Sequence, residues 1–228
     1  LEKSLNVAIV NLAAAVGLEP LADFFRQAGF SNVSAVPSLA IGAIEATPLE
    51  LARAYTIFPN EGVRADPVSI LSVADPKGRP LQQSSVALER VISAQAAYLV
   101  IELMKGALDH GTGRAARAMG LAGDFAGKTG TTNDYKDNWF VGYSRDLLAV
   151  VWVGYDEPRS IGLTGGATAL EIWTRFMRRV YRNDPPPAFL VPEGLEWKDI
   201  DAERGCVARN KNLLREVFIS GTTPRKCP

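Results

Sequence analysis

Residues 126–155, "AGKTGTTNDYKDNWFVGYSRDLLAVVWVGY", contain the pattern that most restricts the fold. Trp139, Val141 and Tyr143 alternate with Phe140 and Gly142, which is the two-residue period of a β-strand. The turn-forming "SRD" follows, and then a continuous apolar run, "LLAVVWVGY", that is typical of a buried strand. These segments predict a hairpin, and "FAGKTGT" is expected to be a neighbouring strand.

Helical periods and end signals surround this strand region. Thr47 and Glu50 form a capping-box pattern with Pro48 between them, and Ser93 precedes a long apolar-periodic run. The patterns predict helices at residues 5–16, 20–28, 47–58, 93–110 and 164–181. In the last of these, the apolar residues expected to face inward are Ile172, Trp173, Phe176 and Val180.

The composition changes after residue 183. "NDPPPAFLVPEG" is rich in proline and breaks helical structure, so we place a domain boundary there. Residues 1–183 are expected to form the main domain, and residues 184–228 a small extension that shows little periodicity.

Length, charge and residue counts exclude several classes of protein. The 228 residues are 47% hydrophobic, and 25 Lys and Arg balance 25 Asp and Glu, so no global charge attracts nucleic acid. A single histidine, His110, and two cysteines with no zinc spacing predict neither a metal site nor a cofactor. The spacing of Cys206 and Cys227 does not decide between two free thiols and one disulfide, and both states remain equally open.

Because the sequence opens at Leu1 without a methionine, we expect a piece of a longer polypeptide.

Two short motifs can carry chemistry. In a strand, Lys128 and Gly130 point to one face and Thr129 and Thr131 to the other, so two hydroxyls beside an ammonium could hold a carboxylate. An ordinary edge strand with solvent-facing lysine is the simpler interpretation of the motif by itself. Ser4, two residues before Asn6, would by itself be interpreted as a helix N-cap.

The combination of these motifs with longer segments resembles one family. "SLN", "EATPLELARAYTIFPNEG", "GALDHGTGRAA", "KTGTTNDYKDNWFVGY" and "GGATALEIWTRFM" are similar to the transpeptidase domain of class A (bifunctional) penicillin-binding proteins. The resemblance runs with gaps from residue 4 to about residue 180. It implies an α+β fold of the penicillin-binding and serine β-lactamase type. That fold is a mainly antiparallel sheet with flanking helices and a helical subdomain, and it is incomplete in this chain.

The resemblance also implies roles for the matched residues. Ser4 would take part in a proton relay, the Asn6 amide would bind the substrate's carbonyl, and Lys128 would tune the relay. Thr129 and Thr131, with Gly130 between them, would bind the carboxylate of a D-Ala-D-Ala stem peptide or of a β-lactam. The backbone of Thr131 would donate one oxyanion-hole hydrogen bond, and losing such a donor costs about 2.7–4 kcal/mol.

The family's nucleophile lies in a Ser-x-x-Lys motif upstream of Ser-x-Asn, and no serine of this chain is followed by lysine at that spacing. We therefore expect this chain by itself to be inactive, and a complementary upstream polypeptide to supply the motif. That segment would also supply part of the fold, so its absence would leave apolar surface and a sheet edge uncovered.

The resemblance implies a serine D,D-transpeptidase that cross-links peptidoglycan and is acylated by β-lactam antibiotics. Two alternatives remain open: a D,D-carboxypeptidase or β-lactamase-like hydrolase, and a non-catalytic peptidoglycan-binding scaffold. The implied location is extracytoplasmic, in the periplasm or on the outer face of the inner membrane, with the parent protein anchored upstream. Such a location favours a disulfide between Cys206 and Cys227.

Overall fold

The computed structural model describes residues 1–157, 159–208 and 213–228. Its centre is an antiparallel sheet in the order β5-β6-β7, built from Ala126–Thr131, Asn138–Tyr143 and Leu148–Val153. The short helix η2 (Asn133–Tyr135) connects β5 to β6, and a tight turn at residues 144–147 connects β6 to β7. The predicted hairpin and its neighbouring strand are confirmed. Within the described residues β5 pairs only with β6, so its other edge is open.

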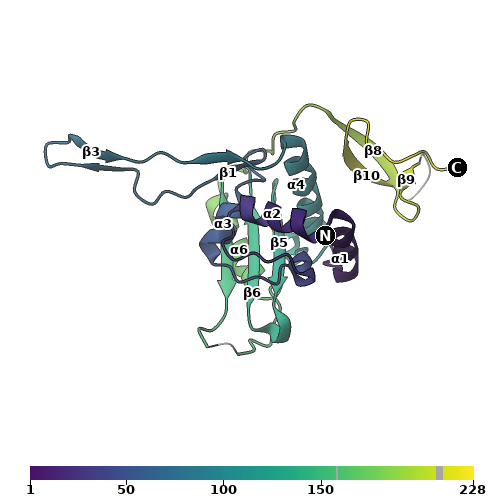
Figure 1. Cartoon of the computed structure of the whole chain (residues 1–228), viewed down its shortest axis with the longest axis horizontal. Coiled ribbons are helices and arrows are strands. Elements are labelled where there is room, and N and C mark those ends of the chain that lie inside the picture. The colour runs from purple at the N-terminus through teal and green to yellow at the C-terminus, as the bar shows by residue number, and fades with distance from the viewer. Residues whose placement is uncertain (158, 209–212) are drawn as a thin grey trace.

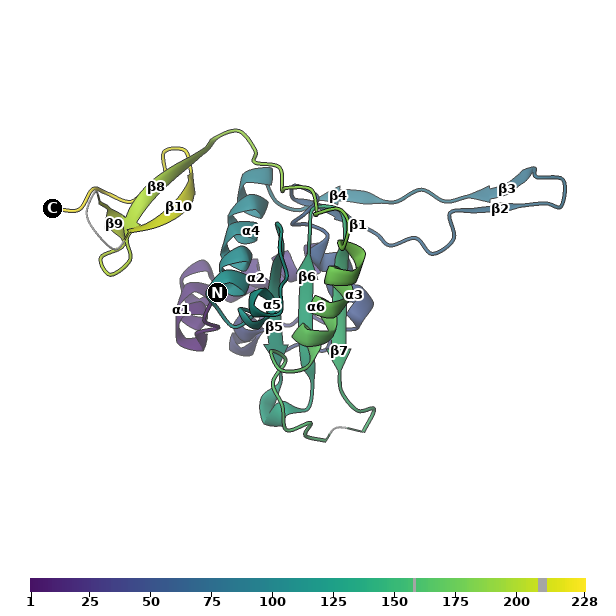
Figure 2. The ribbon, with the colours of Figure 1, turned by 180° about the vertical axis from the view of Figure 1, so that it is seen from behind.

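Helices cover both faces of this sheet (Figures 1 and 2). The helix α6 (Ala169–Val180) packs on one face, where Trp173 contacts Phe140 and donates its indole N–H to the carbonyl of Gly142 at 3.1 Å. On the other face, α3 (Pro48–Tyr55) and α4 (Ala94–Asp109) pack against Tyr143 and its neighbours. The core therefore has two layers separated by the strands.

The inner face of α6 differs from the sequence prediction. Trp173 is fully buried as expected, but Ile172, Phe176 and Val180 are 51, 46 and 48% exposed. The buried stripe consists instead of Ala169, Leu170, Trp173, Thr174 and Met177. Both stripes are largely apolar, so periodicity could not decide which of them faces the sheet. The packing of the Trp173 ring on Phe140 places the stripe that contains Leu170 and Met177 against the sheet.

The capping signals of α3 and α4 and the stop at Gly29 are confirmed. Thr47 and Glu50 form the reciprocal capping box of α3, and the Ser93 hydroxyl accepts from the N–H of Ala96 at 3.1 Å. The helix α2 spans Leu18–Ala28 and ends at Gly29, whose φ of 107° needs a residue without a Cβ.

Three helix ends differ from the prediction: α2 begins at Leu18 instead of Pro20, α3 ends at Tyr55 instead of Phe58, and α6 begins at Ala169 instead of Thr164. Three short helices were not predicted: η1 (Pro37–Ile41), α5 (Ala115–Ala118) and η2 between β5 and β6.

The first helix, α1 (Asn6–Val16), is helical as predicted but almost uncovered. Only Ala13 is buried, whereas Val7 and Leu12 are 75 and 58% exposed. Among the described residues no single helix is long and apolar enough to span a membrane. By length and composition alone, α1 and α2 pass together as a pair bent by 100°.

Two two-stranded sheets between α3 and α4 were not predicted from the sequence. The strands β1 (Val63–Ala65) and β4 (Leu88–Arg90) pair near the body, and β2 (Ser72–Ala74) pairs with β3 (Pro80–Gln83) farther out. Figures 1 and 2 show this segment as a long arm projecting from the sheet domain. Its strands have only three or four residues, too few for a period to be recognised in sequence.

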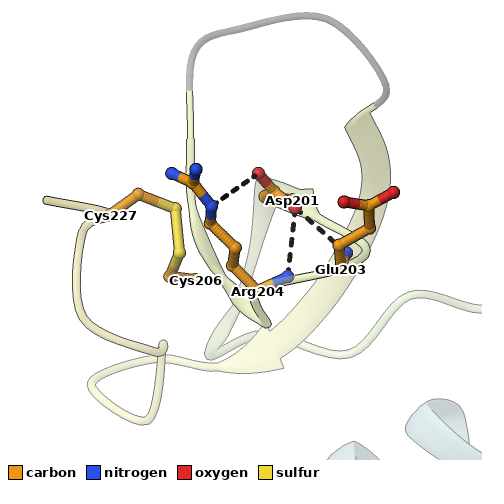
Figure 3. The surroundings of a disulfide bond; sticks show 5 residues. All are labelled: Asp201, Glu203, Arg204, Cys206 and Cys227. Carbon is orange, nitrogen blue, oxygen red and sulfur yellow. Dashed lines mark hydrogen bonds and ion pairs between the residues drawn. A yellow bond between two sulfur atoms is a disulfide. The ribbon is translucent and has the colours of Figure 1, made fainter.

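The C-terminal extension is more regular than its sequence indicated. The strands β8 (Leu195–Asp201), β9 (Cys206–Val207) and β10 (Leu213–Ile219) form a sheet in the order β10-β8-β9. Val217 of β10 and Phe189 pack in a cluster with residues of α4, which attaches this sheet to the main domain. Cys206 and Cys227 form a disulfide with Cα atoms 5.1 Å apart, beside a turn in which Asp201 accepts from the N–H groups of Glu203 and Arg204 (Figure 3).

We predict that this disulfide stabilises the C-terminal sheet more than the main domain. It closes a loop with a sequence separation of 21, and a cross-link over such a loop contributes about 3 kcal/mol on the chain-entropy estimate. In a Cys206→Ser/Cys227→Ser variant, amide hydrogen exchange should accelerate in β8 and β10 and stay unchanged in β5 and β6. Unchanged protection of β8 and β10 would contradict the prediction.

Candidate functional site

The two sequence motifs meet at the open edge of the sheet. The ammonium of Lys128 on β5 donates a hydrogen bond to Ser4 Oγ at 2.6 Å, although 124 positions separate the two residues. The same ammonium donates to the carbonyl of Thr129 at 2.9 Å. Lys128 is therefore directed by two acceptors onto the serine hydroxyl, rather than extended into solvent as on an ordinary edge strand.

Ser4 reaches this position because the preceding residues dock on the end of α4. The N–H of Thr112 donates to the carbonyl of Glu2 at 3.2 Å. A Cβ at Gly111 would come within 2.3 Å of that carbonyl, and one at Gly106 within 1.9 Å of the Glu2 carboxylate. The close approach therefore requires glycine at position 111, where the neighbouring atom is backbone, whereas at position 106 the flexible Glu2 side chain could move away.

Ser4 does not cap the helix that follows it. The N-cap of α1 is Leu5, which makes no side-chain capping bond. Ser4 itself has a positive φ of 51°, and its N–H closes a turn onto the carbonyl of Leu1 at 3.1 Å. Its hydroxyl is thereby turned from the helix toward Lys128. An uncommon backbone conformation held by neighbouring contacts is typical of functional positions.

Burial changes the acid–base behaviour of Lys128. The side chain is half-buried, and desolvation lowers its pKa below the ordinary 10.5. The lowered pKa makes the neutral amine of Lys128 more accessible than that of an exposed lysine. Beside a hydroxyl, such a group can hold the oxygen when charged and accept its proton when neutral.

The two threonines of the motif lie on the opposite face of β5 from Lys128, as alternation predicts. Thr129 Oγ1 lies 2.7 Å from Thr112 Oγ1, on the loop after α4. Thr131 Oγ1 accepts from the N–H of Gly165 at 3.1 Å. A Cβ at Gly165 would come within 2.4 Å of the Gly130 carbonyl, so glycine allows this loop to pack directly on the strand.

Asn6 is the first residue of α1 and is exposed. Within the described residues, no hydrogen bond joins its side chain to Ser4 or Lys128. Its expected role in binding the substrate's carbonyl therefore stays a prediction.

Thr112 and Gly165 were not singled out from the sequence. "GALDHGTGRAA" entered only as a segment of the family resemblance, which gave Thr112 no role. "TGGAT" was interpreted as the start of a helix, whereas α6 begins at Ala169. The adjacent small residues in each segment were the available signal, since they permit backbone to lie against β5.

Fold and site together define a class: a helix-covered antiparallel sheet with a lysine on its edge strand, directed at a serine from a distant segment. The model of the penicillin-binding protein transpeptidase domain matches residues 1–178. The chain therefore belongs to the penicillin-binding protein transpeptidase family.

Individual relatives agree with this assignment. Penicillin-binding protein 1A of Aquifex aeolicus is 35% identical over 232 residues, an alignment that covers 98% of this chain and 31% of the relative. The crystal structure of penicillin-binding protein 1A from Haemophilus influenzae superposes with a TM-score of 0.92 at 28% identity, covering 100% of this chain and 40% of that one. The PonA1 protein of Mycobacterium tuberculosis in complex with penicillin V is 26% identical with a TM-score of 0.59, over 69% of this chain and 44% of that one. The chain thus spans about a third of the Aquifex relative and less than half of either structure.

We predict that Lys128 makes the stability of the protein rise with pH in alkaline solution. The folded protein releases this proton at a lower pH than the unfolded chain does, because burial lowers the pKa. Unfolding therefore takes up a proton between the lowered pKa and 10.5, and stability increases across that window. Lys128→Met should remove this rise in denaturant unfolding curves measured over the pH series, whereas Lys136→Met on the surface should keep it. An identical pH dependence in wild type and Lys128→Met would contradict the prediction.

Proposed function

We propose that this chain supplies the substrate-binding wall and part of the proton relay of a peptidoglycan D,D-transpeptidase. The observation that carries the proposal is the 2.6 Å contact from Lys128 Nζ to Ser4 Oγ, with the hydroxyls of Thr129 and Thr131 on the same edge strand. The positive group lies beside the relay hydroxyl, and two further hydroxyls are available to bind an anion. A stem peptide ending in D-Ala-D-Ala has its terminal carboxylate close to the scissile bond, which suits this arrangement.

The chemistry follows from these positions. A serine supplied by the upstream segment attacks the carbonyl of the penultimate D-Ala, so its Oγ–C bond replaces the C–N bond of the peptide. The proton that the attacking serine loses passes through a relay, formed by the upstream lysine and the Ser4 hydroxyl, to the departing D-Ala nitrogen. Lys128 holds the Ser4 oxygen in this relay. The amine of a second stem peptide then attacks the acyl-enzyme and forms the cross-link. A β-lactam carries a comparable carboxylate and acylates the same serine.

An upstream polypeptide with a Ser-x-x-Lys motif would complete both the site and the fold. Three features of this chain support that proposal: the uncovered helix α1, the exposed apolar stripe of α6, and β7 at the end of the sheet. The apolar stripe of α6, defined by Ile172, Phe176 and Val180, lies on the side of the helix away from the sheet. Large apolar surfaces of this kind are normally covered in a stable protein.

The location proposed for the parent protein is extracytoplasmic, on the outer side of the inner membrane to which it would be anchored upstream. Peptidoglycan strands are cross-linked there. The disulfide between Cys206 and Cys227 suits this location, because disulfides persist in oxidising compartments.

A hydrolase, meaning a D,D-carboxypeptidase or a β-lactamase-like enzyme, would use the same relay with water as the acceptor. Product analysis with an added amine acceptor separates the two, since only a transpeptidase forms the amide. A non-catalytic scaffold would bind stem peptides without turnover. The lowered pKa of Lys128 and its contact with Ser4 favour an enzyme over a scaffold.

We predict that fluorescent penicillin labels the full-length protein but not this chain by itself. The nucleophilic serine would be upstream, so intact-mass analysis after proteolysis should find the adduct on a fragment that precedes Leu1. Lys128→Ala in the full-length protein should lower the acylation rate by about 10²–10³-fold, in the range of lost general acid–base catalysis. A stable adduct on residues 1–228 would overturn the assignment of the nucleophile.

We predict that the upstream segment covers α1. Val7→Glu, at a position 75% exposed in this chain, should weaken association with that segment in a co-expression and pull-down assay, because it would bury a charge in an apolar contact. Leu214→Glu on β10 is the matched control, since Leu214 is also exposed but lies in the C-terminal sheet. Equal retention of both variants would contradict the proposed contact.

A further inference from the structure

Thr112 contacts both halves of the candidate site. Its hydroxyl lies 2.7 Å from that of Thr129, and its N–H donates to the carbonyl of Glu2, two residues before Ser4. We propose that Thr112 is a positioning residue: it orients the Thr129 hydroxyl toward the substrate carboxylate and holds the Ser4 segment beside Lys128. The inference rests on the proposed function and adds to it a residue outside both sequence motifs.

Each threonine hydroxyl has a single proton to donate. Thr131 Oγ1 accepts its bond from a backbone N–H, that of Gly165, so the proton of Thr131 remains available for another acceptor. Thr129 has a hydroxyl partner instead, and either oxygen of that pair could donate. When Thr112 donates, Thr129 is in the same state as Thr131, with its own proton available.

A bound carboxylate selects this direction. Carboxylate oxygens only accept hydrogen bonds, so both threonines of β5 must donate to hold the anion. Thr112 then donates a hydrogen bond to Thr129, and Thr129 donates one to the carboxylate. Successive hydrogen bonds of this kind polarise and strengthen one another.

The backbone contact of Thr112 has a separate consequence. The Glu2 carbonyl lies so close to Gly111 that a Cβ there would come within 2.3 Å of it. The loop after α4 thus fixes the segment that carries Ser4, while the Thr112 side chain contacts the strand that carries Lys128. A shift of this loop would change the distance between Ser4 and Lys128.

These two contacts can be tested separately in the full-length protein. Thr112→Val removes the hydroxyl and keeps the shape of the side chain, and Thr112→Ser keeps the hydroxyl. Gly111→Ala disturbs the Glu2 contact. Thr222→Val removes a hydroxyl that donates to the nearby Ile219 carbonyl in the C-terminal extension and makes no other side-chain hydrogen bond to the residues that the structure describes, so it is the matched control. The measured quantity is the second-order acylation rate with benzylpenicillin and with its methyl ester, which lacks the anionic carboxylate.

Thr112→Val should slow acylation by benzylpenicillin about five- to tenfold, the effect of one hydrogen bond of about 1–1.4 kcal/mol, and should slow the methyl ester less than about twofold. Thr112→Ser and Thr222→Val should stay within about twofold of wild type for both compounds. Gly111→Ala should slow both compounds, because it moves Ser4 rather than the carboxylate site.

A double-mutant cycle tests whether Thr112 acts through Thr129. Once Thr129→Val has removed the hydroxyl, adding Thr112→Val should cause no further loss with benzylpenicillin. Additive losses, or equal losses with acid and ester in Thr112→Val, would overturn the orienting role. An unaffected Gly111→Ala would overturn the role in holding Ser4. A wild-type protein that penicillin does not acylate would instead refute the proposed function itself, so the two failures are distinguishable.

Discussion

The hydrogen bond from Lys128 to Ser4 joins two segments that are 124 positions apart and defines where the site can be. It depends on three features of the fold. The sheet must end at β5, so that the lysine lies at an open edge; α4 must cover the face toward which the lysine points; and the residues before Ser4 must dock on the loop after α4. Burial by this packing lowers the pKa of Lys128, so the packing that brings the two motifs together also adjusts the acid–base chemistry of the lysine.

The support for Ser4 does not come from the helix that follows it. An isolated helix of 11 residues is marginal in water, and α1 buries only Ala13. Ser4 is instead held by the Glu2 carbonyl and by its own turn onto Leu1. The serine side of the site is thus pre-formed by contacts with the main domain, whereas α1, which begins at Asn6, would gain its packing only from a covering partner.

The sequence predicted what periodicity and end signals can encode. The central strands, the caps of α3 and α4 and the stop at Gly29 all follow from local rules, and they are confirmed.

The prediction of which face of α6 is buried was wrong because both of its stripes are apolar. The arm and the C-terminal sheet were missed because their strands are short or are interrupted by turns. The Ser4 contact was visible only as a resemblance, since no local rule relates a serine to a lysine so distant in sequence. Thr112 and Gly165 were missed for the same reason: their partners are set by tertiary packing on β5.

Two of the three hydroxyl groups beside or on β5 accept a hydrogen bond from an N–H group of the protein. Ser4 accepts from an ammonium, Thr131 from a backbone N–H, and Thr129 lies against the hydroxyl of Thr112. For Ser4 and Thr131 the protein supplies a donor to the oxygen, which leaves the hydroxyl proton for another acceptor. An anion that enters such a site finds donors already oriented, so little reorganisation opposes its binding. The loops that supply Thr112 and Gly165 therefore serve the site as much as the motif itself, because they determine the direction in which its hydroxyls can donate.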